Sequence, residues 1–167
     1  SSDLADGPVA REAVDLVDLV ENVVAAHSLP ARAKLMHTEL TLQARRCLAE
    51  PALLISVMDN LYSNAVHYGA ESGNIRIHSY RHGEQVRIDV INDGEPIPSA
   101  ERNMIFEPFY QGSHQRKGAV KGSGLGLSIA HDCVRQMQGE LSLVDEKSGL
   151  ICFRITLPVA ESGKNNV

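Results

Sequence analysis

The stretch Asn60-Leu-Tyr-Ser-Asn64-Ala-Val-His67-Tyr68 is the first of three short segments that decide the fold of this chain. The second is Asn92-Asp93-Gly94-Glu-Pro-Ile-Pro98, and the third is Gly122-Ser-Gly124-Leu-Gly126-Leu-Ser-Ile-Ala. An amide-bearing helix face, an acidic turn after a strand and a glycine-rich turn before a helix can jointly hold a magnesium nucleotide. ATP binding is therefore the first hypothesis.

Length and composition are those of one globular domain. The chain has 167 residues, of which 43% are hydrophobic. No apolar run approaches the length of a membrane span and no signal peptide opens the sequence, so we expect a soluble, cytoplasmic chain without membrane contact. The net charge of −5 argues against a nucleic-acid surface. Cys47, Cys133 and Cys152 have no CxxC spacing, which favours reduced thiols over a disulfide framework or a zinc site.

Apolar periodicity divides the chain into alternating helices and strands. We expect a frayed start or linker over residues 1–12, a folded domain over 13–158 and a disordered tail over 159–167. Helices are predicted over 14–26, ending at Ser28-Leu-Pro30, over 51–68 and over 125–138. Strands are predicted in patches within 37–48 and over 74–81, 85–91, 140–145 and 150–157. This order predicts an α/β two-layer sandwich, with a mixed, mostly antiparallel sheet of about five strands packed against about three helices.

The helix predicted over 51–68 carries polar residues along one face. Asn60, Asn64, His67 and Tyr68 follow the spacing i, i+4, i+7 and i+8, whereas the apolar residues lie on the other side. Two carboxamide oxygens one turn apart could ligate Mg²⁺ without adding negative charge beside a triphosphate. The alternative is an ordinary solvated polar face, which short motifs of this kind often turn out to be.

The second segment ends a strand of alternating apolar residues. Asn92 shares the parity of Val86, Ile88 and Val90, so its side chain is predicted to point toward the buried side, where it needs a hydrogen-bond partner. The exocyclic amine of adenine would be such a partner. The alternative is a turn that binds no ligand, because Asn-Asp-Gly followed by two prolines is a strong turn signal by itself.

The third segment resembles a phosphate loop, although it is not a P-loop. Alternating glycines directly before a helix let backbone N–H groups approach an anion, and the helix N-terminus favours negative charge. The preceding cations Arg116, Lys117 and Lys121 could pair with phosphate. The alternative is a solvated basic loop.

Taken in order, the segments resemble the ATP-binding catalytic domain of bacterial sensor histidine kinases, the GHKL or Bergerat fold shared with DNA gyrase, Hsp90 and MutL. Asn60–Tyr68 resembles the N box, Asn92–Pro98 the G1 box, Ile105–Phe109 the F box and Gly122–Ser128 the G2 box. The resemblance extends from about Val14 to Pro158. Within the family, the stretch from Gly112 to Asp132 most resembles the QseE/GlrK-type kinases of enteric bacteria.

The resemblance implies roles for individual residues. Asn64 would bind Mg²⁺ with Asn60 as a second ligand, and His67 would face the phosphates. Residues 110–121 would form a mobile ATP lid, in which Lys121 joins Asn60, Asn64 and His67 in the catalytic set, and Phe106 and Phe109 would pack beside the lid as its anchor and hinge. The expected nucleotide contacts are Asn64, His67, Tyr68, Asn92, Asp93, Gly94, Ile97, Phe106, Phe109, Arg116, Lys117, Lys121, Gly122, Ser123, Gly124, Leu125, Gly126 and Leu127.

Two departures from the family pattern bear on the activity. Asn92 stands where relatives carry the adenine-binding acid, and Pro96 replaces the second glycine of the G1 box. Gyrase-type ATPases carry a general-base Glu four residues before the magnesium Asn, at the position of Asn60 here. The family pattern thus favours phosphoryl transfer over hydrolysis.

No segment resembles the phosphoacceptor histidine motif of the family. The resemblance therefore implies a monomeric kinase fragment that phosphorylates a histidine on its own dimerisation domain and serves a cognate response regulator. The parent would be a sensor kinase anchored in the bacterial inner membrane. The alternatives are a non-catalytic nucleotide-binding module, which Asn92 and Pro96 would favour, and an anti-sigma serine kinase.

Overall fold

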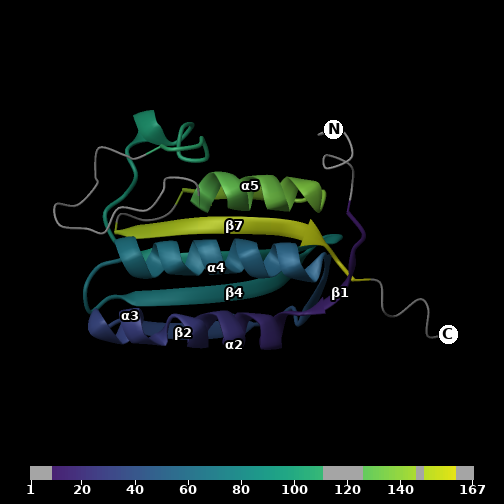
Figure 1. Ribbon diagram of the computed structural model, residues 1–167, viewed down its shortest axis with the longest axis horizontal. Helices are drawn as coiled ribbons and strands as arrows, with labels where there is room; N and C mark the ends of the chain where they lie inside the picture. The colour runs from purple at the N-terminus through teal and green to yellow at the C-terminus, as the bar shows by residue number, and fades with distance from the viewer. Residues whose placement is uncertain (1–8, 111–125, 146–148, 161–167) are drawn as a thin grey trace.

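The computed structural model describes residues 9–110, 126–145 and 149–160 (Figure 1). In chain order the elements are β1 (Glu12–Asp15), α2 (Leu16–Ala26), α3 (Ser28–Ala33), β2 (His37–Leu42), β3 (Arg46–Ala49), α4 (Pro51–Tyr68), β4 (Asn74–His82), β5 (Gln85–Asp93), the 3-10 helix η1 (Ser99–Glu101), α5 (Gly126–Gln136), β6 (Glu140–Val144) and β7 (Leu150–Pro158).

Five strands form one mixed sheet in the order β2-β4-β5-β7-β6. Strands β2 and β4 pair in parallel, and the other three pairings are antiparallel. The short strands β1 and β3 form a separate antiparallel pair. The expected two-layer α/β architecture with a mostly antiparallel five-stranded sheet is confirmed.

Helices α2, α4 and α5 lie side by side over one face of the sheet, with α4 in the middle (Figure 1). The apolar side of α4 supplies the centre of the core, where Leu54 and Met58 are fully buried. Alternating residues of the strands meet them from the sheet, among them Ile75, Ile77 and Ile88. Within the described ranges, no helix has both the length and the apolar character needed to cross a membrane.

Helix α4 begins and ends where its sequence predicts. Pro51 is its first residue, and the carboxylate of Glu50 accepts hydrogen bonds from the N–H groups of Ala52 and Leu53. The helix ends at Gly69, whose N–H donates to the carbonyl of Ala65. A side chain at Gly69 would meet that carbonyl at 2.5 Å, so only glycine fits this close approach.

The N-terminal region differs from its prediction in two ways. Residues 12–15 form β1 instead of a frayed start and a helical turn, because Asp15 caps α2 by accepting from Val17 N at 2.8 Å and Asp18 N at 3.1 Å. A second helix, α3, follows where Ser28-Leu-Pro30 was expected to end the first. Pro30 is tolerated there because the first turn of a helix does not need its N–H.

The face of the sheet opposite the helices carries a charged network. Asp89 is only 5% exposed there, and Arg154 grips its carboxylate with two hydrogen bonds of 2.8 and 3.0 Å. Tyr80 donates a third bond of 3.0 Å to the same carboxylate. The Asp89 carboxylate raises the pKa of the Arg154 guanidinium above its already high ordinary value. The network satisfies a buried charge that would otherwise be costly.

Candidate nucleotide-binding site

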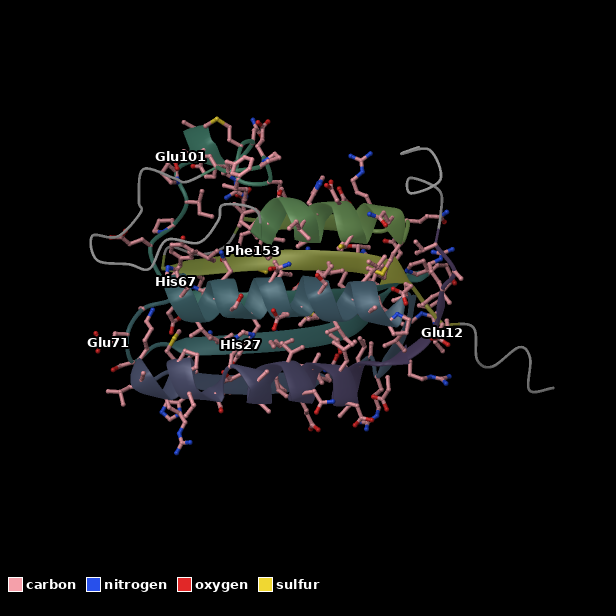
Figure 2. The ribbon with its side chains drawn as sticks, in the orientation of Figure 1. Glu12, His27, His67, Glu71, Glu101 and Phe153 are labelled. Atoms are coloured by element: carbon pink, nitrogen blue, oxygen red, sulfur yellow. The ribbon has the colours of Figure 1, made fainter. Side chains whose placement is uncertain are left out.

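The polar face of α4 is half-buried at the residues that the sequence selected. Asn60, Asn64, His67 and Tyr68 are all of intermediate exposure, whereas their neighbours Leu61 and Ala65 are buried. The ring of His67 packs edge-on against that of Tyr68 with centroids 4.4 Å apart. Figure 2 shows His67 at the end of the molecule opposite Glu12.

The described part of α5 begins against this polar face. A Cβ added to Gly126 would lie 3.4 Å from Oδ1 of Asn60, so the side chain of Asn60 lies close to the backbone of Gly126. The first residue of α5 and an amide oxygen of α4 therefore lie side by side, although they are 66 positions apart in the sequence. The end of the glycine-rich segment thus meets the N-box helix. The side chain of Leu127, the next expected contact, is half-buried and packs against the core.

The Asn92-Asp93-Gly94 turn places its two polar side chains differently. Asn92 is 3% exposed, and its Nδ2 donates to the carbonyl oxygen of Asp93 at 3.0 Å. Oδ2 of Asp93 instead accepts from the backbone N–H of Asn74 at 2.7 Å. Strand parity therefore correctly predicts that Asn92 faces the core, and Asp93 ties the turn to the start of β4.

The C-terminal end of α4 lies directly over this turn. A Cβ at Gly69 would be 2.5 Å from Cε of Met36 and 3.5 Å from Nδ2 of Asn92. Likewise, a Cβ at Gly94 would be 3.1 Å from Nδ2 of Asn92 and 3.5 Å from the Tyr68 carbonyl oxygen. The two glycines thus permit close packing of helix end and turn.

A lysine that the sequence did not single out fixes the helix end. Nζ of Lys34 donates to the carbonyl oxygens of Val66, His67 and Gly69 at 2.8, 2.9 and 2.8 Å. The sequence around Lys34 does not predict this role, because the three acceptor residues follow Lys34 by 32 to 35 positions. Met36 lies beside Gly69 and Ile151 beside Gly94, and the sequence predicts neither contact because both residues have the pattern of ordinary core residues.

The connection after the turn is anchored to the core, to α5 and to β6. Ile97 is half-buried against the core, and the ring of Phe106 stacks on His131 at 4.9 Å. Arg102 donates to the carbonyl of Leu143 on β6 at 3.0 Å, which fastens the segment to the sheet edge. Phe109 instead is 71% exposed with φ of +64°. Its expected packing beside the lid stays a prediction, because the lid lies almost entirely outside the described residues.

Several expected site residues lie outside the described residues: Arg116, Lys117, Lys121, Gly122, Ser123, Gly124 and Leu125. Most of the expected lid also falls there. Within the described ranges, no group of three or more His, Cys, Asp or Glu side chains could hold a metal ion. The described part of the site therefore consists of the polar face of α4, the start of α5 and the turn after β5.

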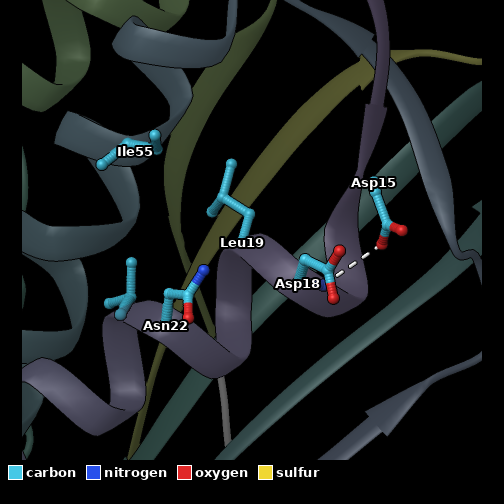
Figure 3. A pocket seen from close by; sticks show the side chains of 6 residues that line it. Asp15, Asp18, Leu19, Asn22 and Ile55 are labelled. Atoms are coloured by element: carbon cyan, nitrogen blue, oxygen red, sulfur yellow. Dashed lines mark hydrogen bonds between the residues drawn. The ribbon is translucent and has the colours of Figure 1, made fainter.

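A separate hollow lies between α2 and α4 and contains none of these residues (Figure 3). Its volume is about 330 Å³, and it is lined by Leu19, Val23 and Ile55 with Asp15, Asp18 and Asn22 at its side. Ile55 precedes the N-box residues by more than one turn of α4. This hollow is thus not the site that the sequence predicts.

Comparison with known proteins settles the family. Residues 49–161 match the family described as histidine kinase-, DNA gyrase B- and HSP90-like ATPases, and this range is more than half of the chain. The chain belongs to this ATPase family. Membership of this ATPase family implies that the domain binds ATP.

Relatives place the chain near the sensor kinases within this ATPase family. Sensor histidine kinase GlrK of Escherichia coli (strain K12) and QseE of Escherichia coli O157:H7 are each 69% identical to it over 160 residues. The match covers 96% of the chain but only 34% of each relative, so the chain spans about a third of their length. The expected resemblance to the QseE/GlrK type is confirmed.

A solved structure confirms the fold. The catalytic domain of histidine kinase ThkA, in a nucleotide-free form, superposes with a TM-score of 0.78 and 25% sequence identity. The superposition covers 91% of this chain and 97% of that one. The Bergerat architecture inferred from the four boxes is therefore the one that the chain adopts.

Proposed function

We propose that this chain is the catalytic domain of a bacterial sensor histidine kinase, which binds Mg-ATP and transfers the γ-phosphoryl group to a histidine on a dimerisation domain of the same protein. The observation that carries the proposal is the meeting of Asn60 with Gly126, because it joins the N box to the start of the helix that follows the glycine-rich segment. The 69% identity to two sensor histidine kinases supports it.

In this proposal the adenine lies at the turn after β5. Oδ1 of Asn92 would accept the adenine amine proton, while Nδ2 donates one of its two N–H groups to the Asp93 carbonyl. Gly94 would let the turn approach the base, and Tyr68 and Ile97 would flank it. Asp93 would contribute mainly by holding the turn against Asn74.

The triphosphate would lie between the polar face of α4 and the start of α5. Backbone N–H groups of Gly122–Leu127 and the helix N-terminus would receive the phosphates. Arg116, Lys117 and Lys121 would add positive charge from the lid, and His67 would contribute from α4. Each of these groups would offset part of the negative charge of the triphosphate.

The residues fit a magnesium ion. Asn60 and Asn64 offer neutral oxygen ligands on one face of α4, and Mg²⁺ commonly takes one or two protein ligands together with substrate phosphates. Oδ1 of Asn60 lies beside the α5 start, where the phosphates would be. A bound Mg²⁺ would neutralise charge on the β- and γ-phosphates during transfer.

Transfer to a histidine suits these residues better than hydrolysis. Asn60 cannot take a proton, so the chain lacks a general base at the position where gyrase-type ATPases carry glutamate. In phosphoryl transfer the protein acts mainly by positioning and by charge stabilisation, and the acceptor imidazole is itself the nucleophile. The amide pair, the cations and the helix N-terminus would supply both effects.

The proposed partners follow from this reaction. The dimerisation domain that carries the histidine would present it to the γ-phosphate, and a response regulator would then receive the phosphoryl group. The chain would lie on the cytoplasmic side of a membrane-anchored parent protein. Residues 13–158 would form the catalytic domain, and the chain by itself would be a monomer.

The binding step can be tested by titrating the chain with ATP and with GTP, each with magnesium and with EDTA. We expect magnesium-dependent binding that prefers ATP. Absence of binding to any nucleotide would overturn the proposal. The transfer step, which separates a kinase from a non-catalytic nucleotide-binding module, needs the acceptor domain and is taken up at the end of the Discussion.

A further inference from the structure

The side chain of Lys34 binds the C-terminal end of α4. Its ammonium group lies within 2.8–2.9 Å of three carbonyl oxygens, those of Val66, His67 and Gly69. The last carbonyls of a helix have no partner within the helix, and an ammonium group has three N–H donors. A cation at this position is also favoured by the helix dipole, whose negative end lies here.

The main chain of Lys34 holds the segment that follows α4. Its carbonyl oxygen accepts from the N–H of Ser72 at 2.8 Å, inside the connection between α4 and β4. Side chain and backbone of one residue thus fasten both the helix end and the loop after it.

This connection is hydrogen-bonded in turn to the Asn92–Gly94 turn, which contains the proposed adenine-binding residue. The N–H of Ala70 donates to the carbonyl of Asp93 at 2.8 Å, and Gly69 packs close to the side chain of Asn92. A continuous path of hydrogen bonds and contacts therefore runs from Lys34 through the end of α4 to the Asn92–Gly94 turn. A shift of the helix end would change the distance between Gly69 and the side chain of Asn92.

We infer that Lys34 is a positioning residue that sets the spacing between the end of α4 and the Asn92–Gly94 turn, and thereby shapes the adenine subsite. The inference rests on the proposed nucleotide site. Lys34 acts through the carbonyls that it binds and makes no contact with the nucleotide.

The inference fixes which part of the ligand responds. Because Lys34 acts at the base end, its loss weakens adenosine and Mg-ATP by the same factor. A residue that acted through its charge on the phosphates would weaken Mg-ATP and leave adenosine unaffected. Comparing the two ligands therefore separates positioning from electrostatic attraction.

The test uses three variants of the full chain. Lys34→Met removes the ammonium and keeps the length of the side chain, and Lys34→Gln retains two N–H donors as a milder change. Arg32→Met is the matched control, because Arg32 is an exposed cation of α3, the helix whose C-cap is Lys34. Affinities for adenosine and Mg-ATP are measured by NMR titration, and urea unfolding shows which proteins are folded under the conditions of the titration.

We expect Lys34→Met to weaken both ligands equally, by a factor between about twofold and thirtyfold, as positional coupling of this kind usually does. Lys34→Gln is expected to weaken both by a smaller factor, and it carries the test if Lys34→Met does not fold. Arg32→Met should change neither affinity. Unchanged adenosine affinity in the folded Lys34 variants, or a loss confined to Mg-ATP, would overturn the inference. Failure of the unsubstituted chain to bind either ligand would instead overturn the proposed function itself.

Discussion

Replacement of Asn92 by leucine tests how the site would read adenine. The side chain is 3% exposed and faces the core together with Val86, Ile88 and Val90. Leucine has a similar size and suits these apolar neighbours, so we expect Asn92→Leu to fold. What it removes is the amide, whose Nδ2 donates to the Asp93 carbonyl at 3.0 Å.

That hydrogen bond determines what Asn92 can recognise. An asparagine amide can in principle present either its oxygen or its nitrogen to a base. Nδ2 turns toward the Asp93 carbonyl and donates one of its two N–H groups to it, so we expect Oδ1, at the other end of the amide, to be the atom presented to the base. An acceptor oxygen matches the amine of adenine but not the carbonyl that guanine bears there. A neutral side chain can therefore select adenine although the charge of the family's acid is absent.

The expected magnitude follows from one lost hydrogen bond at a buried position. Leaving the adenine amine without its partner costs about 1–3 kcal/mol, which corresponds to about 5-fold to 150-fold in ATP affinity. GTP gains nothing from Asn92, so its affinity should hardly change. The preference for ATP over GTP should accordingly fall to near unity in Asn92→Leu.

Asp93→Asn is the matched comparison. Oδ2 of Asp93 accepts from the backbone N–H of Asn74 at 2.7 Å, and an asparagine oxygen can accept the same bond. We expect Asp93→Asn to bind ATP within a few-fold of the unsubstituted chain. Competition against a fluorescent ATP analogue measures the affinities of the unsubstituted chain, Asn92→Leu and Asp93→Asn for Mg-ATP and Mg-GTP. If Asp93→Asn loses ATP while Asn92→Leu keeps its preference, the assignment of Asn92 is wrong.

Three further substitutions test the metal site, a buried thiol and the charged network. Asn64→Ala should weaken magnesium-dependent ATP binding at least about tenfold, because it removes an oxygen ligand of the metal. Asn103→Ala, at an exposed position of the same chain, should not weaken it. Equal effects of the two substitutions in a titration would refute the metal assignment. Burial raises the pKa of the Cys47 thiol from 9.0 to about 12, so this thiol loses its proton at lower pH in the unfolded chain than in the folded one. The free energy of unfolding should therefore fall between pH 9 and 12, and Cys47 should contribute about 1.4 kcal/mol of this decrease per pH unit. Cys47→Ala should flatten that alkaline decline in urea unfolding, and an unchanged slope would count against it. Arg154→Met should lower the free energy of unfolding by about 3 kcal/mol, because the Asp89 carboxylate loses its guanidinium, and the double variant with Asp89→Leu should recover most of the loss; no recovery would contradict this account of the network.

Much of the site could be predicted because its signals are local. Pro51 and Gly69 mark the ends of α4, and the polar residues between them recur at helical spacing. Alternation along β5 gives the direction of Asn92 without knowledge of its neighbours. In each case one segment contains all the information that its conformation requires.

The parts that could not be predicted depend on distant partners. Residues 12–15 contain the spacing of a helix start but pair with β3, more than 30 positions later. Lys34 is the C-cap of the short helix α3, and only the fold brings the carbonyls of α4 to its ammonium group.

The most direct test of the central claim is phosphoryl transfer in two parts. The chain is incubated with γ-labelled ATP and magnesium, alone and together with a separately prepared histidine-bearing dimerisation domain of its parent. We expect no stable label on the chain alone and acid-labile label on the added domain, and this label should be lost when the acceptor histidine is replaced or magnesium is removed. Binding of ATP without any transfer to a folded, dimeric acceptor domain would contradict the claim that this chain is a histidine kinase catalytic domain.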